Sequence, residues 1–405
     1  MKIGPTIYLD HQATTPVAQS VFSQMTPYFG EKFGNPHSAD HSIGWRASKA
    51  VEGAAAKVAE LIGADANEIV FTSGATEANN LALLGVGRHE AGGKRRRILV
   101  SAIEHKCVLQ AARVLEKDHG YHIGFIPVDH TGCVDLQALD DMLTDDVLIV
   151  SVMAVNNEIG SIQNIAKISE LVGSVGAFFH CDAAQAPCAL DLSLFAGLTD
   201  LLSLSAHKMY GPQGIGALFV RHGLEGHIEP LIHGGGQQSG LRSGTVPLAL
   251  SVGMGAAAAL FNDVEVTKKR LKLRGLTDDF VARLRALPWQ VHLNGPLGAM
   301  RHPGNANVQF VGFVASDLLG VLQPHLAAST GSACTSGIPE PSHVLRAIGL
   351  PTKSAEASIR FSLGWETTAE DVEQAVALVR DALSRIQEND TSSGRRKVEA
   401  QLSWR

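Results

Sequence analysis

The chain has 405 residues, of which 45% are hydrophobic and 18% charged, and its formal net charge at pH 7 is −6. This length accommodates one large domain and a smaller one, and the composition excludes a disordered chain. The negative net charge excludes a nucleic-acid binder that acts through bulk positive charge.

The cysteines and the apolar segments indicate where in the cell the protein is expected. The five cysteines are odd in number and form no CxxC pair, which is typical of a reducing compartment and gives no zinc signature. The first residues lack a basic segment followed by an apolar one, so we expect a cytoplasmic protein without a resident metal. Residues 243–262 are uncharged and mostly apolar, but their Gly, Ser, Thr and Pro content predicts a packed helix rather than a membrane span.

Up to about residue 220, short apolar runs alternate with segments of helical periodicity. This alternation predicts an α/β fold, with a mostly parallel central sheet covered by helices on both faces. The predicted strands are residues 7–9, 68–72, 97–101, 122–128, 147–155, 177–181, 201–205 and 216–220, and helices are predicted at residues 45–62, 107–118 and 165–175.

Small or polar residues stand where several predicted strands end. Ala75 and Thr76 open a helix directly after a strand, and the free N–H groups of such a turn favour a phosphate. His105, Asp182 and Gln185 follow two further strands. Because ligands bind beyond the carboxyl ends of the strands of α/β sheets, we expect these side chains to meet at one site.

Residues 201–212, LLSLSAHKMYGP, place Lys208 just beyond a buried strand, with Ser205 and His207 beside it. Burial disfavours an ammonium group, lowers its pKa and makes the amine a nucleophile that can hold an aldehyde cofactor as a Schiff base. From this segment alone, a lysine exposed in a loop remains the alternative.

The helices become longer and more charged near residue 263. We expect a large domain of residues 16–262 and a small α+β domain that joins residues 1–15 to residues 263–388.

The predicted small domain carries two notable features. Cys334 lies in a loop rich in Gly and Ser, and Arg360 lies in a predicted strand at residues 358–363. A last helix is predicted at residues 369–386, and the polar tail at residues 389–405 is expected to be flexible and disordered.

The strand-end residues together match the needs of pyridoxal phosphate. A lysine holds the aldehyde, a carboxylate keeps the pyridinium nitrogen protonated, and an imidazole can stack on the ring and move protons. Each residue alone is ambiguous, because a lone Asp or His at a strand end is more often structural. The assignments are Lys208 for the amine, Asp182 for the ring nitrogen, Gln185 for the phenolic oxygen, His105 for stacking, and Ala75, Thr76, Ser205 and His207 for the phosphate.

Segments along nearly the whole chain, to about residue 386, carry a family resemblance. They include DHQATTPV, FGNPHSADHSIGW, EIVFTSGATEANN, IEHKCV, VNNEIG, HCDAAQ, HGGGQQSGLRSGT and SIRFSLG, and the pair SAHKMYGP and GSACTSG is the most specific. The chain resembles the cysteine desulfurases of the NifS/IscS group, in the class V aminotransferase superfamily. The resemblance implies fold type I of the pyridoxal phosphate enzymes and a homodimer.

The resemblance also implies residue roles. Asn35, Asn157 and Arg360 would bind the substrate carboxylate, and Thr245 would reach the phosphate of the other subunit. Cys334 would take sulfur from L-cysteine as a persulfide, with His105 as proton partner, leaving L-alanine.

The persulfide would then serve an acceptor in iron–sulfur assembly, tRNA thiolation, DNA phosphorothioation or cofactor synthesis. No resident metal is implied, although Cys334 is the position where a transferred iron–sulfur cluster would be held. The other four cysteines are interpreted as packing residues: Cys107, Cys133, Cys181 and Cys188.

The sequence departs from the family pattern in places. Gln238 and Ser239 stand where relatives commonly have Glu-Arg, which removes a charged pair near the dimer-crossing phosphate loop. The tail lacks the terminal segment by which IscS-type enzymes engage their scaffold, which leaves the acceptor open. Basic clusters at residues 94–97 and 395–397 are interpreted as solvated, and a contact with an acceptor linked to RNA or DNA is the alternative.

Two other functions compete with a desulfurase. A class V aminotransferase or lyase on another amino acid would use Lys208 and Asp182 but not need Cys334. A non-catalytic scaffold is disfavoured, because every member of the ring-binding set is present.

Overall fold

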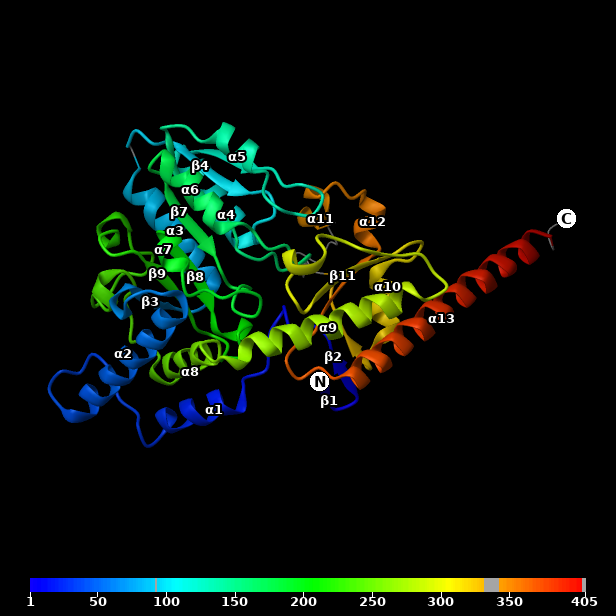
Figure 1. Ribbon diagram of the computed structural model, residues 1–405, viewed down its shortest axis with the longest axis horizontal. Coiled ribbons are helices and arrows are strands. Elements are labelled where there is room, and N and C mark those ends of the chain that lie inside the picture. The colour runs from blue at the N-terminus through cyan, green and yellow to red at the C-terminus, as the bar shows by residue number, and fades with distance from the viewer. Residues whose placement is uncertain (92, 331–341, 403–405) are drawn as a thin grey trace.

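The structure is a computed structural model that describes residues 1–91, 93–330 and 342–402, the last thirteen of them by backbone only. Cys334 lies outside the described residues. Figure 1 shows the large sheet and its helices on one side of the molecule and the smaller sheets on the other, with α13 extending away from the body.

The central sheet has seven strands in the order β3-β9-β8-β7-β6-β4-β5. Only β9 runs against its neighbours, so the predicted α/β fold with a mostly parallel sheet is confirmed. The strands are β3 Ile69–Thr72, β4 Arg97–Ser101, β5 His122–Ile126, β6 Val147–Ser151, β7 Phe178–Asp182, β8 Leu201–Ser205 and β9 Gly216–Val220.

Helices cover both faces of this sheet, because successive strand residues point to opposite sides. Leu201 packs with residues of α3 and α4, whereas Leu202 packs with residues of α2, α6 and α8. The helices are α1 Gln19–Met25, α2 Ser42–Ile62, α3 Ala75–His89, α4 Lys106–His119, α5 Leu136–Met142, α6 Ile165–Ser174, α7 Phe195–Leu198 and α8 Leu248–Ala259. Short 3-10 turns are η1 Thr26–Phe29, η2 Ala66–Glu68, η3 Ala206–Lys208, η4 Glu225–His227 and η5 Gln238–Gly240.

A second hydrophobic core forms around two three-stranded sheets, of order β1-β2-β12 and β10-β11-β13. Ile7 and Leu9 from the N-terminus pack there with Phe280, Phe310 and Phe361. The elements of this part of the chain are β1 Lys2–Ile3, β2 Thr6–Tyr8, α9 Glu265–Arg285, β10 Val291–Leu293, η6 Gly298–Met300, β11 Asn305–Phe310, α10 Ala315–Leu322, β12 Leu326–Ala327, α11 His343–Ala347, α12 Thr352–Glu356, β13 Ser358–Ser362 and α13 Ala369–Leu402. Of these, α11 and α12 pack in a separate cluster with Ile103, Met153 and Ile159. The division into domains of residues 16–262 and of residues 1–15 with 263–388 stays a prediction.

The C-terminal helix corrects the sequence analysis. The helix α13 continues to Leu402, although its end was predicted at Ile386 and the tail from residue 389 was expected to be disordered. No proline interrupts this segment, and extending a formed helix adds one hydrogen bond per residue without a new nucleation cost.

The basic cluster at residues 94–97 is also not simply solvated. Arg95 donates to the carbonyls of Val147 and Val175, at 2.5 and 2.8 Å. The Arg96 guanidinium lies 4.6 Å from the centre of the Tyr121 ring. These arginines therefore bind loop carbonyls and an aromatic face within the fold.

The apolar run near residue 250 forms α8, which lies against α1 and α2. Among the described residues, no helix combines the length and apolar character needed to cross a membrane.

Candidate active site

A cavity of about 730 Å³ opens beyond the carboxyl ends of the central strands. Ten residues expected at the site line it: Ala75, Thr76, His105, Asn157, Asp182, Gln185, Ser205, His207, Lys208 and Arg360. Two others do not: Asn35 and Thr245 are exposed and lie outside the lining.

Lys208 ends η3, directly after the buried strand β8. Its amine donates to the carbonyls of Gln12 and Ala13, at 2.7 and 2.6 Å. Burial, and then the positive charge of Arg360, lower the pKa of Lys208 to about 8. The lysine is thus half-buried in the cavity and not exposed in a loop, and its amine is more often neutral than that of a free lysine.

Asp182 ends β7 and is 5% exposed. One carboxylate oxygen accepts from Asn79 Nδ2 at 2.8 Å, and the other accepts from the backbone N–H of Ala184 at 2.9 Å. Both donors are uncharged. Among the described residues this carboxylate has no cationic hydrogen-bond partner, so a cationic group that enters the cavity can pair with it.

The turn between β3 and α3 is the expected position of an anion cradle. The N-cap of α3 is Gly74, which has no side chain to accept from the first N–H groups of this helix. A Cβ added at Gly216 of β9 would lie 2.6 Å from the carbonyl carbon of Gly74, so only glycine permits this close packing. Free N–H groups at the positive end of a helix favour a phosphate.

His105 is the N-cap of α4 and lines the cavity beside Cys107. Its Nδ1 accepts from the Cys107 N–H at 3.2 Å and lies 3.0 Å from the Cys107 sulfur. Burial lowers the pKa of His105, so the ring is neutral at pH 7 and carries its proton on Nε2. Cys107 therefore lines the cavity and, as expected of a packing residue, also packs against the hydrophobic core.

Glu104, behind His105, is completely buried. Its Oε1 accepts from the N–H of Met153 at 2.5 Å, while its Oε2 has no hydrogen-bond partner in the described part of the chain. Burial, and then the charge of Asp182, raise the pKa of Glu104 well above its ordinary value. This shift favours the neutral form of the Glu104 carboxyl.

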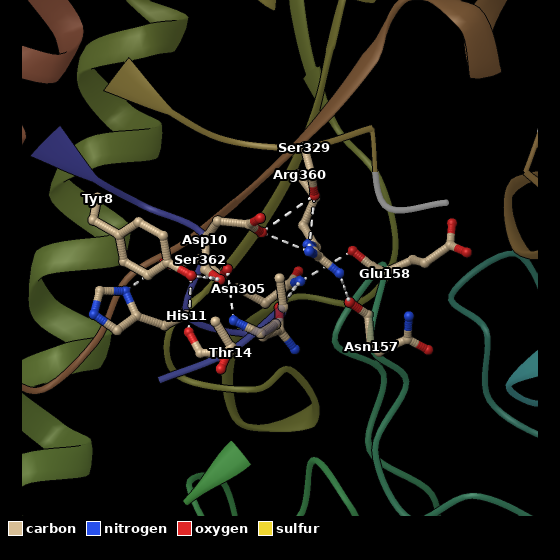
Figure 2. Close-up of polar contacts among 12 residues, drawn as sticks. Tyr8, Asp10, His11, Thr14, Asn157, Glu158, Asn305, Ser329, Arg360 and Ser362 are labelled. Atoms are coloured by element: carbon tan, nitrogen blue, oxygen red, sulfur yellow. Dashed lines mark hydrogen bonds and ion pairs between the residues drawn. The ribbon is translucent and has the colours of Figure 1, made fainter. Parts of the chain in front are cut away.

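The opposite wall of the cavity comes from the small sheets. Arg360 of β13 donates from Nη2 to Asp10 at 2.6 Å and to Ser329 at 2.8 Å, and from Nη1 to the carbonyl of Asn157 at 2.9 Å (Figure 2). Its buried Nε has no hydrogen-bond partner among the described residues. These contacts engage three of the five guanidinium N–H groups, so the N–H of Nε and the second N–H of Nη1 remain for a carboxylate.

Several residues that line the cavity were not predicted from the sequence. Asn79 lies one helical turn after Thr76, so helix periodicity could have found it. Asp10 follows a strand, as the other strand-end residues do, and had the same signal. Glu158 and His343 also line the cavity, but no local pattern pointed to them.

Gln238, where relatives commonly have Glu, makes two hydrogen bonds to the backbone of Phe71. Its Oε1 accepts from the N–H of Phe71 at 2.7 Å, and its Nε2 donates to the carbonyl of Phe71 at 2.9 Å. Phe71 lies in β3, the edge strand that leads to the anion cradle. Nearby, Arg242 forms an ion pair with Glu77 at 2.8 Å. A neutral amide therefore binds the edge of the sheet at this position.

The family described as "Aminotransferase class-V" matches residues 7–375. The chain belongs to this class of proteins, as the fold and the strand-end lysine suggest.

More narrowly, the chain is similar to curated proteins named cysteine desulfurase IscS. The protein of Rickettsia bellii (strain OSU 85-389) is 44% identical over 383 residues, or 94% of this chain and 92% of the relative. That of Rickettsia felis (strain ATCC VR-1525 / URRWXCal2) is 45% identical over 382 residues, with the same coverage of both chains. These relatives place the chain among the cysteine desulfurases of the family.

Solved structures agree with this placement. A NifS-like protein superposes with a TM-score of 0.86 at 34% identity, covering 94% of this chain and 99% of that one. SspA, solved in complex with cysteine, superposes with a TM-score of 0.76 at 35% identity, covering 88% of this chain and 98% of that one.

Proposed function

We propose that the protein is a cysteine desulfurase, which converts L-cysteine to L-alanine and takes the sulfur onto Cys334 as a persulfide. The observation that carries this proposal is one cavity that joins Lys208 and Asp182 on the sheet side to Arg360 on the other. The similarity to named desulfurases, and to a protein solved with cysteine, supports it.

The donors in the cavity fit pyridoxal phosphate. A buried carboxylate bound only by uncharged donors suits a protonated ring nitrogen, and an uncapped helix N-terminus suits a phosphate. When bound, the cofactor supplies an electron sink for bonds at the substrate's α-carbon. The residues that would hold it are Lys208, Asp182, Gln185, His105, Ala75, Thr76, Ser205 and His207.

The chain's own groups then have distinct tasks. Arg360, with its buried unpartnered Nε, binds the carboxylate of L-cysteine beside Asn157. The Lys208 amine, whose pKa of about 8 leaves a useful neutral fraction at pH 7, takes the α-proton. His105 Nε2 is positioned in the cavity as the proton carrier for the thiol chemistry.

Cys334 is the proposed nucleophile that takes the sulfur. Its thiolate attacks the substrate sulfur, an S–S bond forms and the substrate C–S bond breaks. The electron pair stays with the carbon skeleton, which takes up protons to become L-alanine. Burial raises the pKa of all four described cysteines, that of Cys107 and Cys188 to about 12, so these thiols remain protonated.

The working unit is proposed to be a homodimer. Large aromatic side chains on the face formed by α1, η1 and the start of α2 are more than half exposed: Phe22, Phe29, Phe33 and Trp45. Asn35 lies within this face, and Thr245 is exposed outside the cavity. A second copy covering the face would bury the aromatics and allow Thr245 to reach the partner's phosphate. Sedimentation equilibrium of the holoenzyme tests this, and a monomer would contradict it.

A cytoplasmic location is proposed from the cysteines. The four described cysteines are free thiols, which is typical of proteins in a reducing compartment. The persulfide acceptor is proposed to be a thiol protein of sulfur metabolism, and co-purification with the full chain would identify it.

The deciding experiment is Cys334→Ser in the holoenzyme. We expect the cofactor's visible absorbance to be unchanged and sulfide release from L-cysteine to be lost. The matched variant Lys208→Ala should instead alter that absorbance, because the amine that holds the cofactor is gone. Sulfide release that survives Cys334→Ser would favour the competing aminotransferase or lyase.

A further inference from the structure

A cluster of three potential metal ligands lies away from the candidate active site. His89 is the last residue of α3, Glu90 is its C-cap, and His227 ends η4. The Glu90 Oε1 is 2.9 Å from His227 Nδ1 and 3.8 Å from His89 Nε2. All three ligand atoms lie within 4.8 Å of one another.

These separations bracket the spacing of the ligand atoms around a bound ion. Zinc holds its nitrogen and oxygen ligands at about 2.0–2.1 Å in a tetrahedron, so its ligand atoms are roughly 3.3 Å apart. The three side chains could reach that arrangement by small rotations. We propose that His89, Glu90 and His227 form a binding site for a divalent transition-metal ion such as Zn²⁺.

The chemistry of the three groups suits this class of ion. Two imidazoles and one carboxylate are borderline ligands, which Zn²⁺ accepts and which Mg²⁺ and Ca²⁺ do not prefer. The side chains of His89, Glu90 and His227 are 43%, 30% and 47% exposed. An ion can therefore enter from solvent and complete its coordination with water.

The fold holds the ligands together and favours a cation there. The C-terminal end of a helix carries a partial negative charge, and His89 and Glu90 lie at that end of α3. The rings of His89 and His227 contact edge to face, with centroids 5.5 Å apart. The segment after η4 is tied to α3, because the N–H of Glu229 donates to the carbonyl of Gly85 at 3.0 Å.

The cluster lies at the opposite end of the sheet from the cavity. Ala75, at the other end of α3, lines the cavity, and a helix of this length spans roughly 22 Å. Likewise, the Phe178 ring beside His227 begins β7, while Asp182 ends it. The ion would therefore link α3 to η4 and stabilise the fold without touching the reacting atoms.

The test is a Zn²⁺ titration of the full-length holoenzyme by calorimetry, in a Cys334→Ser background so that this thiol cannot take the metal. We expect one Zn²⁺ per chain, and an affinity at least ~10–100-fold lower in His89→Ala and in His227→Ala, since losing a direct ligand costs no less than losing an outer-shell partner of one. Zn²⁺ should also raise the thermal midpoint of the parent, but not that of either variant.

His222→Ala is the matched control, because His222 is also on the surface near η4 and contacts Glu225 at 3.6 Å. It should bind Zn²⁺ as the parent does. Absence of binding up to submillimolar Zn²⁺, or equal affinity in the parent and in His227→Ala, would overturn the proposal. If circular dichroism shows that His227→Ala is unfolded, His89→Ala and Glu90→Gln decide the question.

Discussion

The two walls of the cavity differ in how their charges are held. Among the described residues on the sheet side, Lys208 donates to backbone carbonyls and Asp182 accepts from uncharged donors. On the opposite side, Arg360 is already in an ion pair with Asp10 at 2.6 Å (Figure 2). The sheet wall therefore offers both Lys208 and Asp182 to a cofactor. On the other wall, an incoming carboxylate has to compete with Asp10 for Arg360.

This difference assigns the two walls different tasks. A cofactor that stays bound gains from a preorganised wall with no internal competitor. A substrate must bind and leave in every turnover. Arg360 suits this task, because Asp10 neutralises its charge whenever no substrate carboxylate is bound. The walls are also coupled, because the charge of Arg360 lowers the pKa of Lys208 while that of Asp10 raises it.

The largest effect is expected from Arg360→Gln. The substitution removes two charge-assisted hydrogen bonds to the substrate carboxylate, each contributing about 1.5–3 kcal/mol, so kcat/KM for L-cysteine should fall at least ~100-fold, mainly through KM. Initial rates of alanine formation measure this. An unchanged KM would show that the carboxylate binds elsewhere.

Asp10→Asn and a control variant test whether Asp10 competes with the substrate for Arg360. Asp10→Asn removes the competing carboxylate while keeping Arg360, so KM should decrease rather than increase. Arg283→Gln is the neutral control, since Arg283 pairs with Asp279 on the surface at 2.9 Å. An increase of KM in Asp10→Asn would mean that the ion pair positions Arg360 rather than competes for it.

A smaller effect is expected in the pH dependence of cofactor capture. Only the neutral amine of Lys208 attacks the aldehyde, and its pKa is lowered to about 8. In cofactor-free protein, the rate of covalent attachment of pyridoxal phosphate should rise about tenfold per pH unit below pH 8 and level off above it. Stopped-flow absorbance measures the rate, and a continued rise towards pH 10 would contradict the lowered pKa.

Arg360→Gln tests the coupling of the walls in the same assay. Removing this positive charge should raise the pKa of Lys208, and the plateau of the capture rate should shift to higher pH. Asp10→Asn should shift it in the opposite direction, because the charge of Asp10 raises this pKa.

The sheet wall was predictable from the sequence because its signals are local. A buried apolar run followed directly by a polar residue marks a strand end, and parallel strands bring those ends to one edge. Lys208 and Asp182 were found in this way, and both line the cavity. Asn79 was missed because it lies inside a helix and not at a strand end.

The opposite wall depends on contacts that no local pattern contains. Asp10 and Arg360 are 350 positions apart in sequence, and only the pairing of β2, β12, β11 and β13 with their neighbours brings them together. Arg360 itself was assigned by resemblance. Asn35 and Thr245 lie outside the cavity of a single chain, and the roles expected for them stay predictions.

The smallest effect is expected where the chain departs from its family, at Gln238. Glutamate would keep the acceptor for the Phe71 N–H but lose the donor to the Phe71 carbonyl, and would set a carboxylate against that carbonyl oxygen. Gln238→Glu should therefore lower the free energy of unfolding by about 1–3 kcal/mol, measured as a lower thermal midpoint of the holoenzyme.

Gln238→Met separates the loss of hydrogen bonds from the repulsion by a carboxylate, because it removes both hydrogen bonds without adding a charge. A smaller loss in the methionine variant than in the glutamate variant would assign the difference to the carboxylate facing the Phe71 carbonyl. Since β3 leads directly into the turn at Gly74, either variant should also weaken retention of the phosphate end of the cofactor on dilution. Equal stability of Gln238→Glu and the parent would show that the edge of β3 does not depend on this amide.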